Sequence, residues 1–298
     1  MTNSQCGSRS AICKGIAERS SIREREVSSL KVVGIDYWTD FGKRLNEHLG
    51  PFEGARVLDI GTGRGACLFP AANIIGSEGE IIGIDLRENA ISEVKAKIQN
   101  LGLTNASVQI MNANEMSFTD NSFDFILSGF IGFNDVFDFK TQNYRKENKK
   151  MSEMLRILKK GGKIGFTTWL LQEDLEWLGT LIEEYLMQNL GIKNHAEIVN
   201  VPTSYSKESV EGFRKIMLDA GFQNVDVFVE EFKIRYQDEE EWWDMMLRVG
   251  EIPRRIMGSD GTKLLDFKKQ MFRRGLQDFK LDNGLYFTKA VIFAFGTK

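Results

Sequence analysis

The chain is poor in residues that cross-link, bind metal or break secondary structure. Its 298 residues include three cysteines, two histidines and four prolines. The cysteines, Cys6, Cys13 and Cys67, have neither an even count nor the short spacing of zinc ligands. This argues against a disulfide framework and against structural zinc. No linker, internal repeat or low-complexity tract divides the chain.

The chain also lacks a charge excess and a long hydrophobic run. The formal net charge is -3 and the pI about 5.7, so we expect no nucleic-acid partner. No apolar run approaches the ~18 residues of a membrane span. Residues 1–30 are rich in Ser, Arg and Glu and contain no apolar stretch, so they predict a flexible polar leader rather than a secretory signal. We expect a cytoplasmic protein, and its oligomeric state stays open.

Apolar segments with strand and helix periods alternate along the chain. Strands are predicted near 55–60, 80–85, 106–111, 123–128 and 162–168, and helices near 26–49, 64–75, 88–101 and 144–158. This alternation predicts a parallel sheet covered on both faces. Two more strands are predicted near 225–234 and 285–295, with an insertion at about 238–283 between them.

The most informative motif lies where the first of these strands ends. Asp59 is followed by three alternate glycines, Gly61, Gly63 and Gly65, which open a helix. Glycines allow a sharp bend and let a ligand lie against the backbone, and the helix N-terminus offers free N–H groups. A second acid, Asp85, ends the next strand about 20 residues later, where βαβ nucleotide-binding folds place the carboxylate that binds a ribose diol.

Two ligands fit this glycine pattern. A nicotinamide dinucleotide would be satisfied by Gly61, Gly63 and Ala66, but its pyrophosphate would be repelled by a carboxylate at Asp59. A ligand with a ribose, no phosphate and a positively charged amino-acid tail suits both Asp59 and Asp85. S-adenosylmethionine is such a ligand.

In these motifs the chain resembles class I S-adenosylmethionine-dependent methyltransferases, over about residues 35–236. The resemblance implies a Rossmann-like α/β fold with a seven-stranded, mostly parallel sheet, an antiparallel last strand and a helical cap. It further implies one methyltransferase domain over 31–298, with N-terminal helices and the insertion at about 238–283 as the cap.

The resemblance also implies roles for individual residues. Asp59 would face the methionine amino group, Asp85 would hold the ribose hydroxyls, and Leu86 would pack on the adenine. Asn112 stands where most relatives have Asp, in the loop that reads the adenine amino group. The predicted cofactor-binding residues are Asp59, Gly61, Thr62, Gly63, Asp85, Leu86, Asn112, Ala113 and Ser128.

Within the class, the chain looks most like small-molecule methyltransferases of polyketide, alkaloid and terpenoid tailoring. They share the pattern seen here at residues 61–66 and 70–72. Residues 128–131 lack the Asn/Asp-Pro-Pro-Tyr/Phe sequence of enzymes that methylate base amines or glutamine amides. The resemblance therefore implies an enzyme of specialised metabolism that methylates a small molecule and releases S-adenosylhomocysteine.

Aromatic residues at loop and cap positions favour a large, apolar acceptor. An aromatic residue taken alone more often packs in the core than contacts a ligand. The predicted acceptor-pocket residues are Tyr37, Trp38, Phe41, Phe130, Phe133, Trp169, Trp242 and Trp243. Because aromatic faces can stabilise a carbocation, this set favours C-methylation of a terpenoid or prenyl compound.

The sequence leaves three alternatives open. O-methylation of a phenol or carboxyl group would use a base, for which His195 is the candidate. A basic run in the insertion is either a clamp for a diphosphate or the solvated face of a helix; it consists of Lys268, Lys269, Arg273 and Arg274. The chain could also bind S-adenosylmethionine without turnover.

Overall fold

The computed structural model describes residues 31–131, 137–138, 143–144, 149–179, 181, 209–249, 261–274, 279–281 and 283–298. The chain forms two compact units. The larger unit comprises Asp36–Leu170, Tyr205–Glu230 and Ala290–Lys298, and the smaller unit comprises Met1–Ile35, Leu171–Ser204 and Glu231–Lys289. Three long strands contribute residues to both units: β8 (Leu158–Gln172), β9 (Gln223–Tyr236) and β11 (Gly284–Thr297).

The larger unit is built on a mostly parallel sheet. Its strand order is β9-β11-β8-β5-β2-β3-β4, with β2 (Arg56–Ile60), β3 (Glu80–Asp85), β4 (Ala106–Ile110) and β5 (Phe123–Gly129). The neighbouring strands β8, β5, β2, β3 and β4 pair in parallel. β11 runs the opposite way, since Gly161 N–H at the start of β8 donates to the carbonyl of Lys298, just past the end of β11. The expected Rossmann-like sheet with an antiparallel last strand is confirmed.

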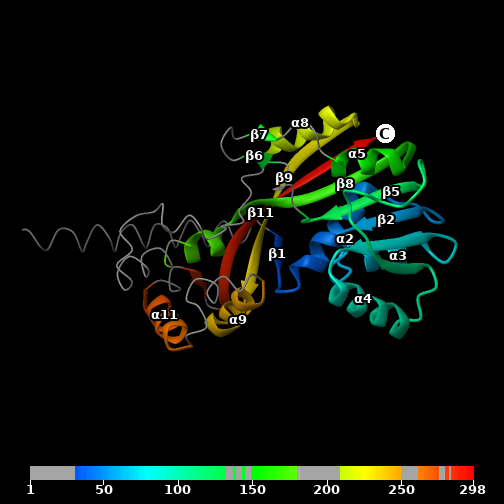
Figure 1. Ribbon diagram of the computed structural model, residues 1–298. Coiled ribbons are helices and arrows are strands. Elements are labelled where there is room, and N and C mark those ends of the chain that lie inside the picture. The colour runs from blue at the N-terminus through cyan, green and yellow to red at the C-terminus, as the bar shows by residue number, and fades with distance from the viewer. Residues whose placement is uncertain are drawn as a thin grey trace, which may run out of the picture. The chain divides into compact units, whose positions relative to one another are not determined.

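Helices cover both faces of this sheet (Figure 1). They are α2 (Tyr37–Leu49), α3 (Leu68–Ile75), α4 (Glu88–Asn100), α5 (Lys149–Ile157) and α8 (Val210–Ala220). Neighbouring residues of β8 show the two faces. Ile164 is buried in a core with Met154 of α5 and Phe213 of α8, whereas Gly165 faces Leu45 of α2. Apolar contacts on both faces hold the strand ends in place.

The smaller unit contains the predicted insertion. Its elements are β1 (Lys31–Val33), α9 (Glu239–Val249), α11 (Gly261–Arg274) and β10 (Lys280–Leu281). β1 pairs in parallel with the part of β9 at residues 232–234, and β10 pairs with β11. Inside the unit, Lys289 Nζ lies 2.7 Å from Asp174 Oδ1, and both side chains are almost completely buried. Such a pair is costly to break because either partner alone would be a buried, unpaired charge.

The structure differs from the expected elements in three details. A helix was predicted over about 26–49, but residues 31–33 form strand β1 and the helix begins at Tyr37. The β-branched pair Val32-Val33 favours an extended strand. β1 and β10 bring the sheet to nine strands in the described part of the chain, two more than expected. The helix predicted over 64–75 begins at Leu68, because Gly63 and Gly65 adopt φ angles of +54° and +82°.

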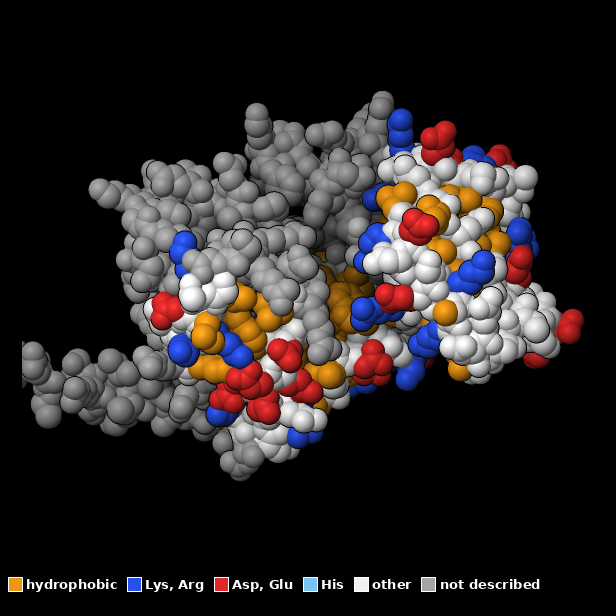
Figure 2. All heavy atoms as spheres, turned by 60° about the horizontal axis from the view of Figure 1, so that its bottom comes forward, with side chains coloured by type: hydrophobic (Ala, Val, Ile, Leu, Met, Phe, Trp, Pro, Cys, Tyr) orange, Lys and Arg blue, Asp and Glu red, His pale blue; other side chains and the backbone are white. Residues whose placement is uncertain are grey.

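Charges of both signs are interspersed on the face of the larger unit that Figure 2 shows. This distribution follows from the nearly balanced composition of 39 basic and 42 acidic residues. Within the described residues, no helix is long and apolar enough to cross a membrane.

Helix α2 is fastened to the glycine-rich turn that follows β2. A Cβ atom at Gly42 would overlap the carbonyl group of Ala66, so only glycine allows this close approach. The buried Asn46 Nδ2 donates to the carbonyl oxygens of Gly42, at 2.8 Å, and of Cys67, at 3.1 Å. Helix and turn are thus held as one piece.

We predict that Gly42→Ala lowers the free energy of unfolding by about 1–3 kcal/mol, since the added methyl group overpacks this contact. Gly179→Ala is the control, because Gly179 is also helical and its Cβ position is open. Alanine should there be neutral or slightly stabilising. Denaturant titration of both variants measures the difference, and equal stabilities would contradict the contact.

Candidate active site

The turn between β2 and α3 presents its backbone at the carboxyl end of the sheet. Gly61 and Gly63 have φ angles of +72° and +54°, a conformation that side chains disfavour. The N–H groups of Gly61 and Thr62 donate to the carbonyl of Ile84 at 2.8 and 2.9 Å, which ties the turn to β3. Open α/β sheets bind ligands at this edge.

Asp59 lies beneath this turn and is 1 % exposed. Its Oδ2 accepts a hydrogen bond from Thr62 Oγ1 at 2.7 Å, and it also accepts one from the backbone N–H of Leu68. Burial, together with repulsion from Asp85, raises the pKa of Asp59 to about 7, and these hydrogen bonds only partly offset the increase. No cation of the described residues is among the groups that act on Asp59, and such a buried carboxylate favours a positively charged ligand.

Asp85 ends β3 and faces the same turn. Its Oδ2 accepts from Gly63 N–H at 3.0 Å, and its Oδ1 accepts from the backbone N–H of Arg87 at 3.0 Å. Burial raises the pKa of Asp85, but hydrogen bonds from Arg87 and Gly63 more than offset this and hold it below its usual value. Asp85 therefore stays ionised at neutral pH.

The other predicted cofactor residues lie on the adjacent strand ends. Leu86 is 67 % exposed, unusual for a leucine next to a buried acid and suited to covering an adenine ring. Asn112 Oδ1 already accepts a hydrogen bond from Asn114 N–H at 3.0 Å, and Ala113 lies inside this turn. Ser128 is buried near the end of β5, and its hydroxyl has no hydrogen-bond partner among the described residues.

Five of the predicted acceptor residues form one cluster in the larger unit, which we call the aromatic wall: Tyr37, Trp38, Phe41, Phe130 and Trp169. The centroids of Phe130 and Trp169 are 4.4 Å apart, and Trp38 meets both edge-on at 5.0 and 5.4 Å. Tyr37 and Phe41 are buried behind them, whereas the other three rings stay partly exposed. The wall thus offers an apolar face built from three separate elements.

The aromatic wall lies next to the glycine turn. Ile131, which follows Phe130, packs so closely on Gly61 that a Cβ there would overlap its side chain. Phe130 has a φ of +57°, a conformation that costs energy for a bulky residue, and its N–H donates to the carbonyl of Thr167 at 2.8 Å. Backbone strain is therefore concentrated where the two predicted sites meet.

The two predicted tryptophans of the insertion are not part of this cluster. Trp242 and Trp243 belong to the smaller unit, where they are 0 and 4 % exposed. Trp242 packs against Trp177 at 5.5 Å and Phe287 at 5.7 Å, within that unit's own core. Phe133 and His195 lie outside the described residues, so their roles stay predictions.

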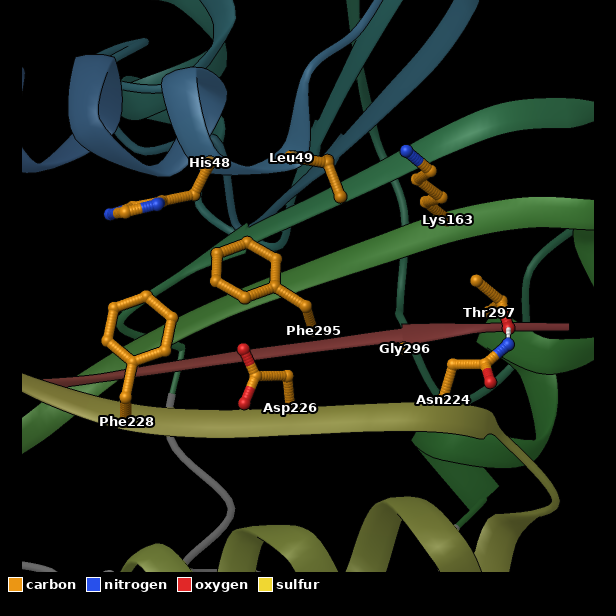
Figure 3. A pocket seen from close by; sticks show the side chains of 9 residues that line it. All are labelled: His48, Leu49, Lys163, Asn224, Asp226, Phe228, Phe295, Gly296 and Thr297. Atoms are coloured by element: carbon orange, nitrogen blue, oxygen red, sulfur yellow. Dashed lines mark hydrogen bonds between the residues drawn. The ribbon is translucent and has the colours of Figure 1, made fainter.

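His48 lies at the edge of the sheet opposite the glycine turn. It lines a pocket of about 260 Å³ with residues of β9 and β11, including Asp226, Phe228 and Phe295 (Figure 3). Its Nε2 is 2.8 Å from Glu230 Oε1. These strand residues lie near the start of β9 and the end of β11, opposite the carboxyl ends of the parallel strands. His48 is therefore no base for a reaction at the turn.

Three residues at the site were not predicted. They are Arg87, which binds Asp85, Gly42, which lets α2 approach the turn, and Thr167, whose buried hydroxyl has no partner among the described residues. A basic residue two positions after Asp85 was a visible signal for the first. The other two follow from packing between distant segments, which no local pattern reveals. Among the described residues, no three His, Cys, Asp or Glu side chains gather as a metal site requires.

A nucleoside-binding α/β fold with a buried acid beneath its glycine turn defines the general class of the protein. A known family matches residues 51–200, just over half of the chain, and is described as a methyltransferase domain, Methyltransf_31. The chain belongs to this family. The predicted class, an S-adenosylmethionine-dependent methyltransferase of class I, is thereby confirmed, and with it the cofactor.

Among curated relatives, the chain is 39% identical over 107 residues to aklanonic acid methyltransferase DauC of Streptomyces sp. strain C5, covering 36% of this chain and 49% of that protein. It is 34% identical over 93 residues to nocamycin O-methyltransferase of Saccharothrix syringae, covering 31% and 33%. The chain thus spans at most about half the length of these relatives. Among solved structures, YcgJ of Bacillus subtilis matches with a TM-score of 0.54 at 18% identity, over 88% of this chain and 98% of that one, which shows the fold alone.

The raised pKa of Asp59 predicts a pH-dependent affinity. A cationic amino group binds the ionised carboxylate, so affinity for S-adenosylmethionine should fall as the pH is lowered through about 7, approaching tenfold per pH unit below it. Asp85 and Cys67 also face Asp59, but the pKa of Asp85 lies below its usual value and that of Cys67 well above. Neither titrates between about pH 5.5 and 7.5.

Calorimetric titration over this pH range measures the effect. Asp59→Asn is the matched control, because it keeps the shape of the side chain and removes the titrating group. It should bind more weakly and without this pH dependence. A wild-type affinity that stays constant over the range would contradict the assignment.

Proposed function

We propose that the protein transfers the methyl group of S-adenosylmethionine to a small, largely apolar acceptor in specialised metabolism. The observation that carries this is the buried carboxylate of Asp59 beneath a turn whose glycines leave its backbone open. A pyrophosphate there would face a negative charge at short range, whereas an amino group would neutralise it. Asp85, at the end of the neighbouring strand, supplies the acceptor oxygens for a ribose.

The aromatic wall supports an apolar acceptor. Trp38, Phe130 and Trp169 bring large ring faces next to the turn on which the cofactor would lie. The names of two relatives, aklanonic acid methyltransferase and nocamycin O-methyltransferase, are consistent with acceptors that are small molecules. The insertion at 238–283, which belongs to the smaller unit, is proposed to be an acceptor-specific cap.

Methyl transfer makes few demands on side chains. A nucleophile displaces the methyl group in line from a sulfonium, and the positive charge on sulfur disappears in the transition state. Holding the two reactants in line in a dry pocket can supply ~7–11 kcal/mol of the acceleration. The described residues at the turn and the aromatic wall include no histidine, and positioning is the contribution that we propose for them.

The methyl group could be transferred to a carbon or to an oxygen atom of the acceptor. The aromatic wall favours C-methylation of a terpenoid or prenyl compound, since ring faces stabilise a developing carbocation. The name of the nocamycin relative favours the alternative, O-methylation, for which His195 remains the proposed base. A third possibility is binding of the cofactor without turnover.

The basic run in α11 gives little support to a diphosphate clamp. Lys268 pairs with Glu240, and its Nζ lies over the ring of Trp243 at 5.7 Å. Lys269 is exposed, and the side chains of Arg273 and Arg274 lie outside the described part of the structure. Lys268 thus already has an anionic partner within the smaller unit.

Incubation with methyl-labelled S-adenosylmethionine and an extract of the source cells tests the proposed function. We expect label in a small, extractable molecule, with the transfer lost in Asp59→Asn and Asp85→Ala. Mass spectrometry of the product would show whether carbon or oxygen carries the methyl group. Tight cofactor binding without any labelled small molecule would favour the non-catalytic alternative.

The aromatic wall predicts a selective effect on the acceptor. Trp38→Ala should raise the acceptor KM about tenfold and change cofactor affinity less than about twofold, because this ring belongs to the wall and not to the glycine turn. Phe52→Ala is the control, an exposed ring that packs on Phe125 at 5.3 Å, away from the wall. Equal effects of both substitutions on KM would count against this pocket.

A further inference from the structure

The carboxylate of Asp85 is fully occupied by donors from its own chain. Oδ1 accepts from the backbone N–H of Arg87 at 3.0 Å and from Arg87 Nε at 3.1 Å. Oδ2 accepts from Gly63 N–H at 3.0 Å and from Arg87 Nη2 at 3.2 Å. A carboxylate has about four lone-pair positions, so these four donors leave none for a ligand.

These donors are of two kinds. The two backbone N–H groups belong to the glycine turn and to the start of α4, and they fix the orientation of the carboxylate. The guanidinium of Arg87 is on a side chain that is 66 % exposed, whereas the Asp85 side chain is 8 % exposed. The side chain of Arg87 can therefore move into solvent while the carboxylate stays in place.

The guanidinium places one N–H on each carboxylate oxygen. A ribose diol presents the same pattern, with two neighbouring O–H donors for two oxygens. If the side chain of Arg87 leaves, one lone-pair position becomes free on Oδ1 and one on Oδ2, which matches what a diol needs.

We propose that Arg87 sets the affinity and specificity for the cofactor by occupying the ribose-binding positions of Asp85 until a diol replaces it. This inference rests on the proposed function, because it assumes that a nucleoside binds at Asp85. A ligand with only one hydroxyl would restore only one of the two hydrogen bonds that Arg87 loses. Competition of this kind therefore disfavours ligands that lack one of the two ribose hydroxyls.

Substitution of Arg87 by methionine tests this directly, with S-adenosylhomocysteine as the probe in calorimetric titration. Arg87→Met removes the guanidinium that competes for Asp85, so this variant should bind the probe about three- to tenfold more tightly than the wild type. Arg64→Met is the matched control, since Arg64 is an 86 % exposed arginine on the same turn, and its Nε lies 3.4 Å from Glu93 Oε2. It should bind with unchanged affinity.

A second comparison separates competition from charge. S-adenosylmethionine carries one more positive charge than S-adenosylhomocysteine, so loss of a repelling cation would tighten binding of the former only. Competition for Asp85 predicts the same factor for both. Arg87→Lys keeps the positive charge but cannot donate to both carboxylate oxygens in the same way, so its gain in affinity should be intermediate. In an Asp85→Asn background, Arg87→Met should give no gain.

Equal or weaker binding of S-adenosylhomocysteine by Arg87→Met, or a gain limited to S-adenosylmethionine, would overturn the role of Arg87 and leave the proposed function intact. Failure of the wild type and all variants to bind either nucleoside would instead contradict the proposed function itself.

Discussion

The desolvated carboxylate of Asp59 is the constraint on which the rest of the site depends. A rise in its pKa from 3.8 to about 7 corresponds to roughly 4 kcal/mol in favour of the neutral acid. Thr62 and the N–H of Leu68 offset part of the burial cost, and no cation of the described chain provides the remainder. A ligand amino group would do so. Relief of this unfavourable burial by a ligand amino group would contribute to the binding energy. This distinguishes the site from a phosphate-binding turn with the same glycines.

The fold brings this charge together with the acceptor side. Gly42 and Asn46 fasten α2 to the glycine turn, and α2 carries three rings of the aromatic wall, Tyr37, Trp38 and Phe41. Ile131 connects the end of β5 to Gly61. The glycine turn and the aromatic wall are therefore joined by these few contacts, and packing fixes their separation. A reaction driven by positioning needs this rigidity.

The local patterns predicted the sheet well, because each strand is a short apolar run with clear ends and because Asp59 and Asp85 stand at the ends of two of them. From places after strands and in the first helix, they also selected the five rings that form the aromatic wall; the role of these rings in binding an acceptor stays a prediction. They failed where conformation depends on distant partners. β1 forms because residues 31–33 pair with β9, and α3 starts late because the glycines hold a turn. Arg87 was missed because its role depends on the side-chain geometry at Asp85. The pairing of Trp242 with Trp177 joins segments distant in sequence.

The most direct test of the account is a calorimetric comparison of S-adenosylhomocysteine with a nicotinamide dinucleotide on the full chain at neutral pH. We expect saturable binding of the first and no measurable binding of the second, since only the first carries an amino-acid amino group that could neutralise Asp59. Binding of the dinucleotide, with no response to S-adenosylhomocysteine, would contradict it.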